Sequence, residues 1–230
     1  MKRVDRPSPN HDSRGHDARG DAPIDMLVLH YTGMASGTAA LDRLCDPAAK
    51  VSAHYTIDED GTVYAMVPEA RRAWHAGVSW WGGDTNINTR SIGIELVNPG
   101  HEFGYRAFPE AQIAALTTLC HGILMRHPIP SARVLGHSDV APARKDDPGE
   151  LFPWERLAKA GIGLWPISQD SNLSANGGVE ALCRYGYDPG AGEQKIVTAF
   201  QRHFRPAKID GVWDRECARL LASLLQKAGV

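Results

Sequence analysis

The stretch MLVLHY at residues 26–31 decides the fold, because it is a short apolar run that ends in a histidine. A run of this length and composition predicts a buried strand. SIGIELV at 91–97 alternates in polarity and is rich in β-branched residues, which predicts a second strand. ARVLGH at 132–137 predicts a third, and it also ends in a histidine. Strands of this kind, alternating with helical segments, indicate an α/β fold with a central mixed β-sheet flanked by helices.

Helical and hairpin patterns lie between these strands. Residues 36–46 look helical, and residues 109–127 place apolar side chains at helical spacing after Pro109 and Glu110, which suit a first turn. The β-rich runs 51–58 and 62–67 flank an Asp-Gly pair. Such a pair between two strand-like runs is a hairpin signal.

The composition divides the chain into four parts. Residues 1–23 carry nine charged residues among Pro, Ser and Gly, which predicts an extended or mobile N-terminal arm. Residues 24–166 form the α/β domain. Residues 167–175 lie in a linker-like stretch, and 176–230 read as a small three-helix C-terminal domain. A unit of about 50 residues is near the lower limit for folding alone, so we expect the C-terminal domain to pack against the first domain.

The overall composition excludes several classes of protein. The chain has 230 residues, 43% of them hydrophobic and 23% charged, with a formal net charge of −2. No basic field exists to attract nucleic acid or an anionic membrane. No apolar run approaches the ~18 residues of a membrane span, and the N-terminus lacks the apolar core of a secretory signal. The four cysteines are far apart and form no CxxC pair, so we expect reduced thiols and a cytoplasmic protein.

Two histidines and a carboxylate occur where strands end. His30 and His137 each close a predicted strand, and Asp147 follows ten residues after His137. Strand ends at one edge of a sheet are common places for sites. Two histidines and one carboxylate with an open fourth position form the ligand set of a catalytic zinc centre. The alternative is a solvated loop, since GHSDVAPARKDDPG at 136–149 is rich in turn formers.

A hydrolase also needs a group that exchanges protons and one that stabilises an oxyanion. Glu95 is the only carboxylate within the apolar run 91–97, and a lone acid in a strand is costly unless it serves a site. It could instead pair with an arginine such as Arg90. Lys145 lies two residues before Asp147, so in an extended segment both side chains point to one face. The residues alone therefore indicate a metallohydrolase as one of two interpretations.

Four segments carry a resemblance to a known family. The sequence resembles the zinc-dependent N-acetylmuramoyl-L-alanine amidases of the AmpD-like type (amidase type 2), relatives of the peptidoglycan recognition proteins. The matching pieces occur in the family's order and are LVLHYTG at 27–33, VSAHYTIDEDGTVYAMVPEARRAWHAG at 51–77, INTRSIGIELVN at 87–98 and VLGHSDVAPARKDDPGELFPW at 134–154. More weakly, residues 176–225 resemble a peptidoglycan-binding module of the three-helix type.

The resemblance implies roles for individual residues. It implies that Zn2+ is held by His30, His137 and Asp147, with Glu95 as the catalytic acid/base and Lys145 as the oxyanion stabiliser. The position of His75 matches one that lines the family's substrate groove, although a hydrogen-bonded loop histidine is its ordinary interpretation. Further expected positions are Arg90 and Asn98 for sugar or peptide contacts, Trp80 and Trp81 for stacking on a sugar or covering the core, and His54 for a structural role.

The resemblance implies hydrolysis of the amide between (anhydro-)N-acetylmuramic acid and L-alanine in peptidoglycan fragments, in cell-wall recycling. We expect a monomer whose partners are muropeptides, not nucleic acid or a membrane. One alternative is a hydrolase of intact sacculi in the periplasm or envelope, because members with such an added module are often exported. A non-catalytic peptidoglycan-binding protein is the rival from another class. The HExxH signature of common zinc peptidases is absent.

Overall fold

The centre of the fold is a six-stranded β-sheet in the order β1-β7-β6-β9-β5-β10. The computed structural model describes residues 2–17, 20–167 and 177–229. Strands β10, β5, β9 and β6 run parallel to one another, whereas β7 is antiparallel to β6. The predicted mixed sheet is therefore confirmed. The strands are β1 (Arg3–Asp5), β5 (Met26–Tyr31), β6 (Tyr55–Ile57), β7 (Val63–Ala65), β9 (Ser91–Leu96) and β10 (Val134–Gly136).

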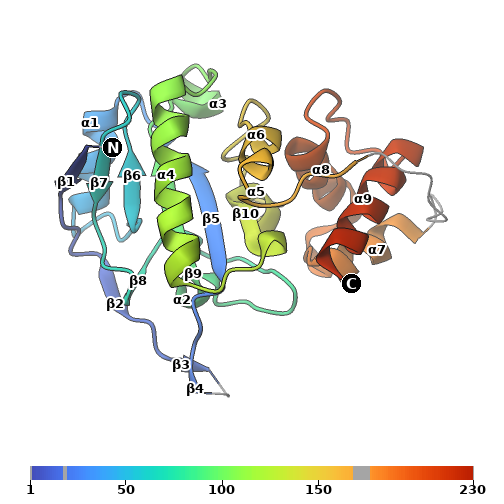
Figure 1. Ribbon diagram of the computed structural model, residues 1–230, viewed down its shortest axis with the longest axis horizontal. Helices are drawn as coiled ribbons and strands as arrows, with labels where there is room; N and C mark the ends of the chain where they lie inside the picture. Colours follow the sequence, from blue (N-terminus) through green and yellow to red (C-terminus); the bar gives the residue numbers. More distant parts are fainter. Residues whose placement is uncertain (1, 18–19, 168–176, 230) are drawn as a thin grey trace.

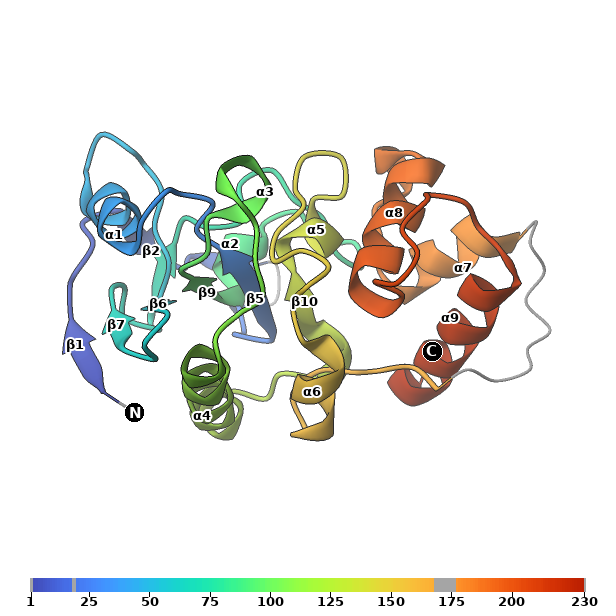
Figure 2. The same ribbon diagram turned by 90° about the horizontal axis from the view of Figure 1, so that it is seen from above.

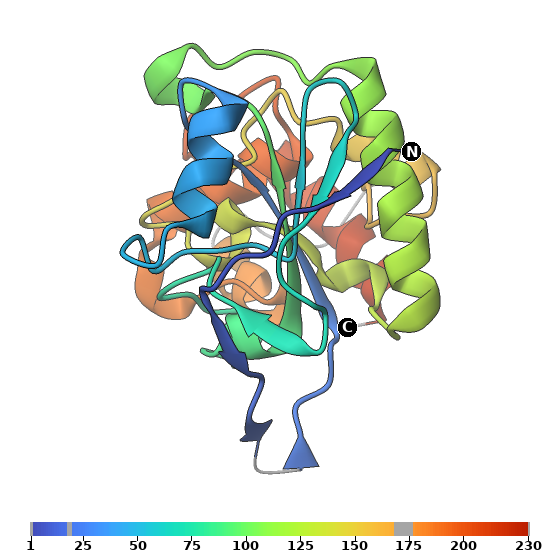
Figure 3. The ribbon, with the colours of Figure 1, turned by 90° about the vertical axis from the view of Figure 1, so that its left-hand side faces the viewer.

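Helices cover both faces of this sheet. Figures 2 and 3 show α4 on one side of the sheet and α1 on the other, while Figure 1 shows the last three helices beyond β10. The helices are α1 (Gly37–Cys45), α2 (Ile87–Arg90), α3 (Gly100–Phe103), α4 (Glu110–Arg126), α5 (His137–Val140), α6 (Trp154–Lys159), α7 (Gly178–Tyr185), α8 (Glu193–Phe204) and α9 (Arg215–Ala228), with 3-10 turns at Ser131–Arg133 and Pro189–Ala191. None in the described ranges has the length and apolarity of a transmembrane span.

Alternation along β5 feeds two separate cores. Leu27 and Leu29 belong to the cluster formed with α4, and Met26 and Val28 belong to a cluster completed by the C-terminal helices. Successive side chains of a strand point to opposite faces, so one strand is buried on both sides. The C-terminal helices therefore contribute to the same apolar cluster as one face of β5.

Local sequence signals account for the main elements. The hairpin between β6 and β7 turns at Asp60-Gly61, and Gly61 adopts a φ of +82°, which favours glycine. Helix α4 begins after Pro109 and ends before Pro128, a position where proline disfavours further helix. The buried amide of Gln112 donates to the carbonyls of Ile57 and Val97 and so ties α4 to the sheet.

The N-terminal segment is extended and paired. Its composition predicts an extended or mobile arm, but β1 pairs in parallel with β7 at the sheet edge. Strand β2 (His11–Ser13) pairs with β8 (Arg71–Ala73), and Arg14 donates to backbone carbonyls of Glu69, Thr89 and Ser91. Of the two predicted alternatives, these contacts favour the extended one for residues 2–14. The short strands β3 (His16–Asp17) and β4 (Gly20–Asp21) then project from the body in Figure 3.

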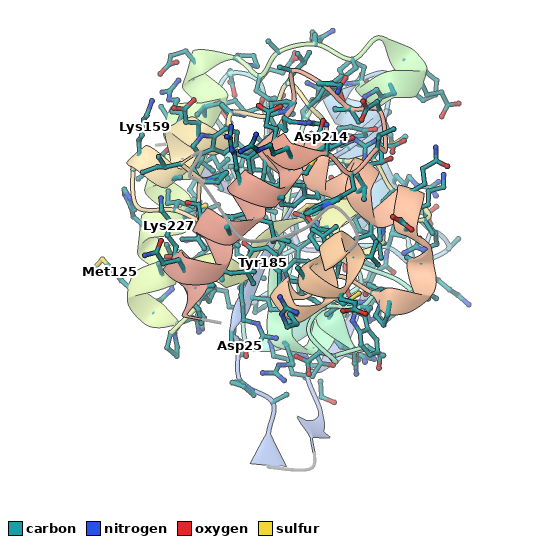
Figure 4. The ribbon with its side chains drawn as sticks, turned by 90° about the vertical axis from the view of Figure 1, so that its right-hand side faces the viewer. Asp25, Met125, Lys159, Tyr185, Asp214 and Lys227 are labelled. Carbon is teal, nitrogen blue, oxygen red and sulfur yellow. The ribbon has the colours of Figure 1, made fainter. Side chains whose placement is uncertain are left out.

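The three predicted C-terminal helices are present as α7, α8 and α9. Figure 4 looks onto them, with Tyr185 between the helices and Asp214 at the start of α9. The Asp214 side chain accepts a hydrogen bond from Cys217 N and so caps α9. The cysteines are free. Apart from residue 167, the predicted linker 167–175 lies outside the described residues.

Candidate active site

The polar edge of the site lies where β5 and β9 end. His30 and Glu95 are register partners on these neighbouring parallel strands, so both side chains point to the same face. On β9 that face carries Ser91, Gly93 and Glu95, while the intervening isoleucines enter the core. A Cβ on Gly93 would lie 2.4 Å from Cγ of His75, so the glycine makes room for this ring. The alternation of apolar and polar or small residues that predicts β9 thus also places Ser91, Gly93 and Glu95 on the face of the site.

Three donor atoms converge at the carboxyl end of the sheet. Nδ1 of His30 lies 3.0 Å from Nδ1 of His137 and 3.0 Å from Oδ2 of Asp147. The remaining edge, from Nδ1 of His137 to Oδ2 of Asp147, is 3.1 Å. A tetrahedral zinc ion bonded at about 2.0–2.1 Å would hold its donors about 3.3 Å apart. This triangle is therefore close to what such an ion requires, and the group can hold a metal.

A chain of hydrogen bonds fixes where the proton of His30 resides. The Ser91 hydroxyl donates its one hydrogen to the carbonyl of Ile87, at 2.7 Å, so its oxygen must accept from Nε2 of His75, at 3.1 Å. Nδ1 of His75 then accepts from Nε2 of His30, at 3.1 Å. This leaves Nδ1 of His30 as a bare lone pair that points at the other two donor atoms.

The second histidine is fixed in the same way. Nε2 of His137 lies 3.0 Å from the carbonyl of Ala76, which can only accept, so Nε2 carries the hydrogen and Nδ1 is free. Partners of this kind orient metal-binding histidines and set their tautomer. Three acceptors at mutual distances near 3 Å repel one another unless a cation lies among them.

The ionisation of the donors suits a metal. Burial, followed by the proximity of His137, lowers the pKa of His30 to about 4 against the opposing effect of Asp147, so His30 is neutral at pH 7. Burial alone would raise the pKa of Asp147, but the neighbouring His137 and His30 hold it well below its usual range. A neutral histidine and an ionised carboxylate are the forms that bind metal ions.

Two of the three donor residues, His137 and Asp147, line a cavity of about 390 Å3. Glu95 and Lys145 line it beside His137 and Asp147. Burial raises the pKa of Glu95 well above its usual range, the charge of Asp147 adds to the rise, and the ammonium of Lys145 opposes it. Oε2 of Glu95 is buried and has no hydrogen-bond partner among the described residues. An unpaired acid beside a cluster of metal-type donors is poised for proton exchange.

The predicted site residues divide into two groups. His75 lines the cavity and also forms a hydrogen bond with His30. The two predicted alternatives, a residue lining the groove and a hydrogen-bonded histidine, therefore do not exclude each other. Neither Arg90 nor Asn98, which are predicted to contact substrate, lines this cavity. Glu95 does not pair with Arg90, since Arg90 lies just before the amino end of β9 and Glu95 lies near its carboxyl end.

Arg90 belongs to a structural ion network. It pairs with Asp25 and with Asp84, and Arg133 pairs with the same two carboxylates at 2.8 and 2.7 Å. Asp25, Arg90 and Arg133 each precede a strand of the sheet, so this network joins the amino ends of β5, β9 and β10. Asn98 is fully buried, and its amide binds the carbonyl of Arg106 and the N–H of Gly100, which shapes a turn.

The other predicted residues, Trp80, Trp81 and His54, do not line the cavity. Trp81 is 3% exposed and packs edge-on against Tyr185 and Tyr187, so it covers the core. Trp80 is half-buried and does not line the cavity. His54 is buried, and its Nδ1 accepts a hydrogen bond from Gly93 N at 2.9 Å.

We expect the substitution Ser91→Ala to weaken zinc binding by about 10-fold, at the lower end of what loss of an outer partner does. Without the hydroxyl, Nε2 of His75 loses its acceptor, and the tautomer of His30 is no longer fixed. Titration against a chromophoric chelator measures the zinc affinity. The matched control is Ser223→Ala, which removes a buried hydroxyl that accepts from Ile167 N in the C-terminal helices. Equal zinc affinities in the two variants would contradict the relay.

The fold and the site define a class of amide hydrolase. The family model for N-acetylmuramoyl-L-alanine amidases matches residues 20–150, and the chain belongs to this family. Its enzymes hydrolyse the amide bond between N-acetylmuramic acid and L-alanine in peptidoglycan fragments, and this chain is such an amidase.

Individual relatives are similar over most of the chain. The N-acetylmuramoyl-L-alanine amidase AmiD of Escherichia coli K12 is 38% identical over 90% of this chain and 84% of its own length. Its solved complex with anhydro-N-acetylmuramic acid-L-Ala-D-gamma-Glu-L-Lys has a TM-score of 0.82 at 37% identity, covering 93% of both chains. AmpDh3 of Pseudomonas aeruginosa, in complex with anhydromuramic pentapeptide, gives 0.82 at 34% identity, covering 93% and 95%. The 1,6-anhydro-N-acetylmuramyl-L-alanine amidase AmpD of E. coli K12 is 35% identical over 66% of this chain and 87% of its own length.

Proposed function

We propose that this amidase is zinc-dependent, with His30, His137 and Asp147 as its metal ligands. The observation that carries the proposal is the convergence of three hydrogen-free acceptor atoms within 3.0–3.1 Å of one another. Two histidines and one carboxylate with an open position are typical of catalytic zinc. Zinc in such a site supplies Lewis acidity towards a carbonyl oxygen and towards water.

We further propose how the protein side chains act in the reaction. Glu95 takes a proton from the attacking water, for which its unpaired, buried oxygen is available. The ammonium of Lys145, on the cavity wall, stabilises the negative charge that develops on the former carbonyl oxygen. Glu95 then delivers the proton to the departing nitrogen of L-alanine. The products are the sugar acid and a stem peptide with a free amino group.

The proposed substrates are soluble muropeptides with an anhydro sugar. Two related structures hold such molecules, anhydro-N-acetylmuramic acid-L-Ala-D-gamma-Glu-L-Lys in AmiD and anhydromuramic pentapeptide in AmpDh3. Arg43, Arg144 and Lys145 line the cavity, and these cations suit the carboxylates of a stem peptide. We infer a role in cell-wall recycling, in the cytoplasm, by a monomer. The alternative is an envelope hydrolase of intact sacculi, with a C-terminal unit that binds glycan.

Products from two substrates offered side by side test this proposal. Purified, zinc-loaded protein would be given soluble anhydro-muropeptides and intact sacculi, and released peptides would be identified by mass spectrometry. We expect rapid release of stem peptide from the soluble substrate and little from sacculi. Efficient stripping of sacculi would support the envelope alternative. Cleavage of neither, with zinc bound at one equivalent, would overturn the zinc mechanism.

A further inference from the structure

The segment 137–147 carries most of the proposed chemistry on one loop. It begins at His137, ends at Asp147 and includes Lys145. Four backbone hydrogen bonds lie within it, from Ser138 N to the carbonyl of Asp147, from Ala141 N to that of His137, and from Arg144 N and Lys145 N to that of Ala141. Side chains on this loop need a fixed backbone, because misplacement by about 1 Å can reduce a rate by roughly 10²-fold.

The first external support is a buried carboxylate. Asp139 is fully buried, two residues after His137. It accepts one local bond, from Gly136 N at 2.7 Å, and two from the C-terminal unit. These come from the hydroxyl of Tyr187 and from Nδ1 of His203, each at 2.7 Å. A buried carboxylate would be costly without such donors, so the C-terminal unit completes its hydrogen bonding.

The ring of His203 is itself locked in place. It stacks between Trp154 and Phe204, with both ring centroids 3.8 Å away. Trp154 opens α6 and belongs to the core under the sheet, so the stack joins α8 to the first domain. Asp139 is thus held by a side chain that has little freedom to move.

The second support lies at the other end of the loop. Arg202, next to His203 on α8, pairs with Asp146 at 2.8 Å. The Arg202 side chain is only 12% exposed, whereas Asp146 is 59% exposed. Asp146 stands between Lys145 and Asp147 in the chain, so this contact reaches the backbone that presents both. Figures 1 and 2 show α8 beside α5, the first turn of the loop.

We infer that the C-terminal unit is a positioning element of the active-site loop, with Arg202, His203 and Tyr187 clamping it near both ends. The inference rests on the proposed function for the roles of His137, Lys145 and Asp147. The unit also shares a continuous apolar core with β5 and β10, which opposes its moving as an independent module. The sequence of this unit resembles a glycan-binding module, yet its contacts reach the loop that carries the proposed reaction site.

The experiment compares two arginines of the same helix region in the full-length, zinc-loaded protein. Arg202→Gln removes the contact with Asp146. Arg205→Gln is the control, because Arg205 pairs with Asp214 and Glu216 inside the C-terminal unit and does not contact the loop. Tyr187→Phe is the second test, since it removes one hydroxyl from Asp139 and keeps the ring that packs on Trp81. Arg202→Lys keeps a cation on α8.

We measure kcat and KM separately, zinc affinity by chelator competition, the absorption spectrum of the cobalt-substituted protein, and Tm. Arg202→Gln and Tyr187→Phe should each lower kcat about 10-fold with little change in KM, and should shift the cobalt spectrum or weaken zinc binding. Arg202→Lys should recover part of the loss. Arg205→Gln should lower Tm at least as much, yet keep wild-type kcat and spectrum below its Tm.

Two results separate the failures of the two ideas. If the wild type binds no zinc or releases no peptide, the proposed function fails. The clamp formed by Arg202, His203 and Tyr187 then has no catalytic loop to position. If the wild type does both, but Arg202→Gln and Tyr187→Phe match Arg205→Gln in kcat, KM and spectrum, the clamp alone is wrong and the contacts only stabilise the fold.

Discussion

Glu95→Gln should abolish hydrolysis and leave zinc bound, with a loss of kcat of about 10²–10⁴-fold. The amide is nearly isosteric with the carboxyl group but cannot accept and return a proton. Activity is measured by peptide release, and bound zinc by metal analysis of the same sample. The control is Glu155→Gln, an exposed carboxyl that pairs with Lys159 on α6. Near-normal turnover with zinc bound would contradict the role of Glu95.

The same substitution should change the pH dependence of stability in the metal-free protein. Burial raises the folded-state pKa of Glu95 above its unfolded value, so the folded state binds this proton more tightly. That stabilising contribution is fully present below about pH 4.5 and is lost as pH rises through the folded pKa. Glutamine does not titrate, so the Tm of Glu95→Gln minus that of the wild type should increase from pH 4.5 to pH 8. A constant difference would contradict the raised pKa.

Much of the catalytic domain follows from periodicity along the chain. The runs that end in His30 and His137 and the alternating run around Glu95 become β5, β10 and β9, because apolar side chains at a spacing of two must be buried. The helices α1 and α4 and the hairpin at Gly61 follow from caps and turn residues. The paired N-terminal segment does not, since its polar composition hides edge pairing made by backbone groups.

The residues of the candidate site that could be predicted are those whose side-chain chemistry and position in the sequence are both unusual. His30 and His137 are singled out by their place at strand ends, Glu95 by its place within an apolar run, and Asp147 and Lys145 by their spacing in the polar loop after His137. Their convergence depends on the strand order, which brings segments far apart in sequence to one edge.

Residues that act through others carry weaker signals. The period-two pattern of Ser91, Gly93 and Glu95 places a hydroxyl and a gap on the face of the acid, a signal that could have pointed to His75. Nothing near Asp139 in sequence indicates Tyr187 or His203, because these partners lie 48 and 64 residues further along the chain. Arg90 looks like a ligand contact by its place beside β9, but carboxylates distant in sequence neutralise it.

Asp147→Asn should remove zinc from the site, with affinity falling by more than the roughly 100-fold that loss of an outer partner can produce. The carboxylate is the one full negative charge among the three donors, and its replacement leaves two neutral histidines to hold a divalent ion. Metal analysis after dialysis should show wild type at one equivalent and the variant near none, with peptide release lost in parallel.

A matched control distinguishes direct binding of zinc by Asp147 from the effect of removing any negative charge from the cavity. Glu102→Gln removes one negative charge from the same cavity wall, outside the donor triangle, and should keep zinc at one equivalent. Asp147→Asn differs from it only in touching His30 and His137, at 3.0 and 3.1 Å. Loss of zinc in Asp147→Asn alone identifies a direct ligand, because charge acting at a distance would weaken both variants. Zinc retained at one equivalent in Asp147→Asn would show that the ion is held elsewhere.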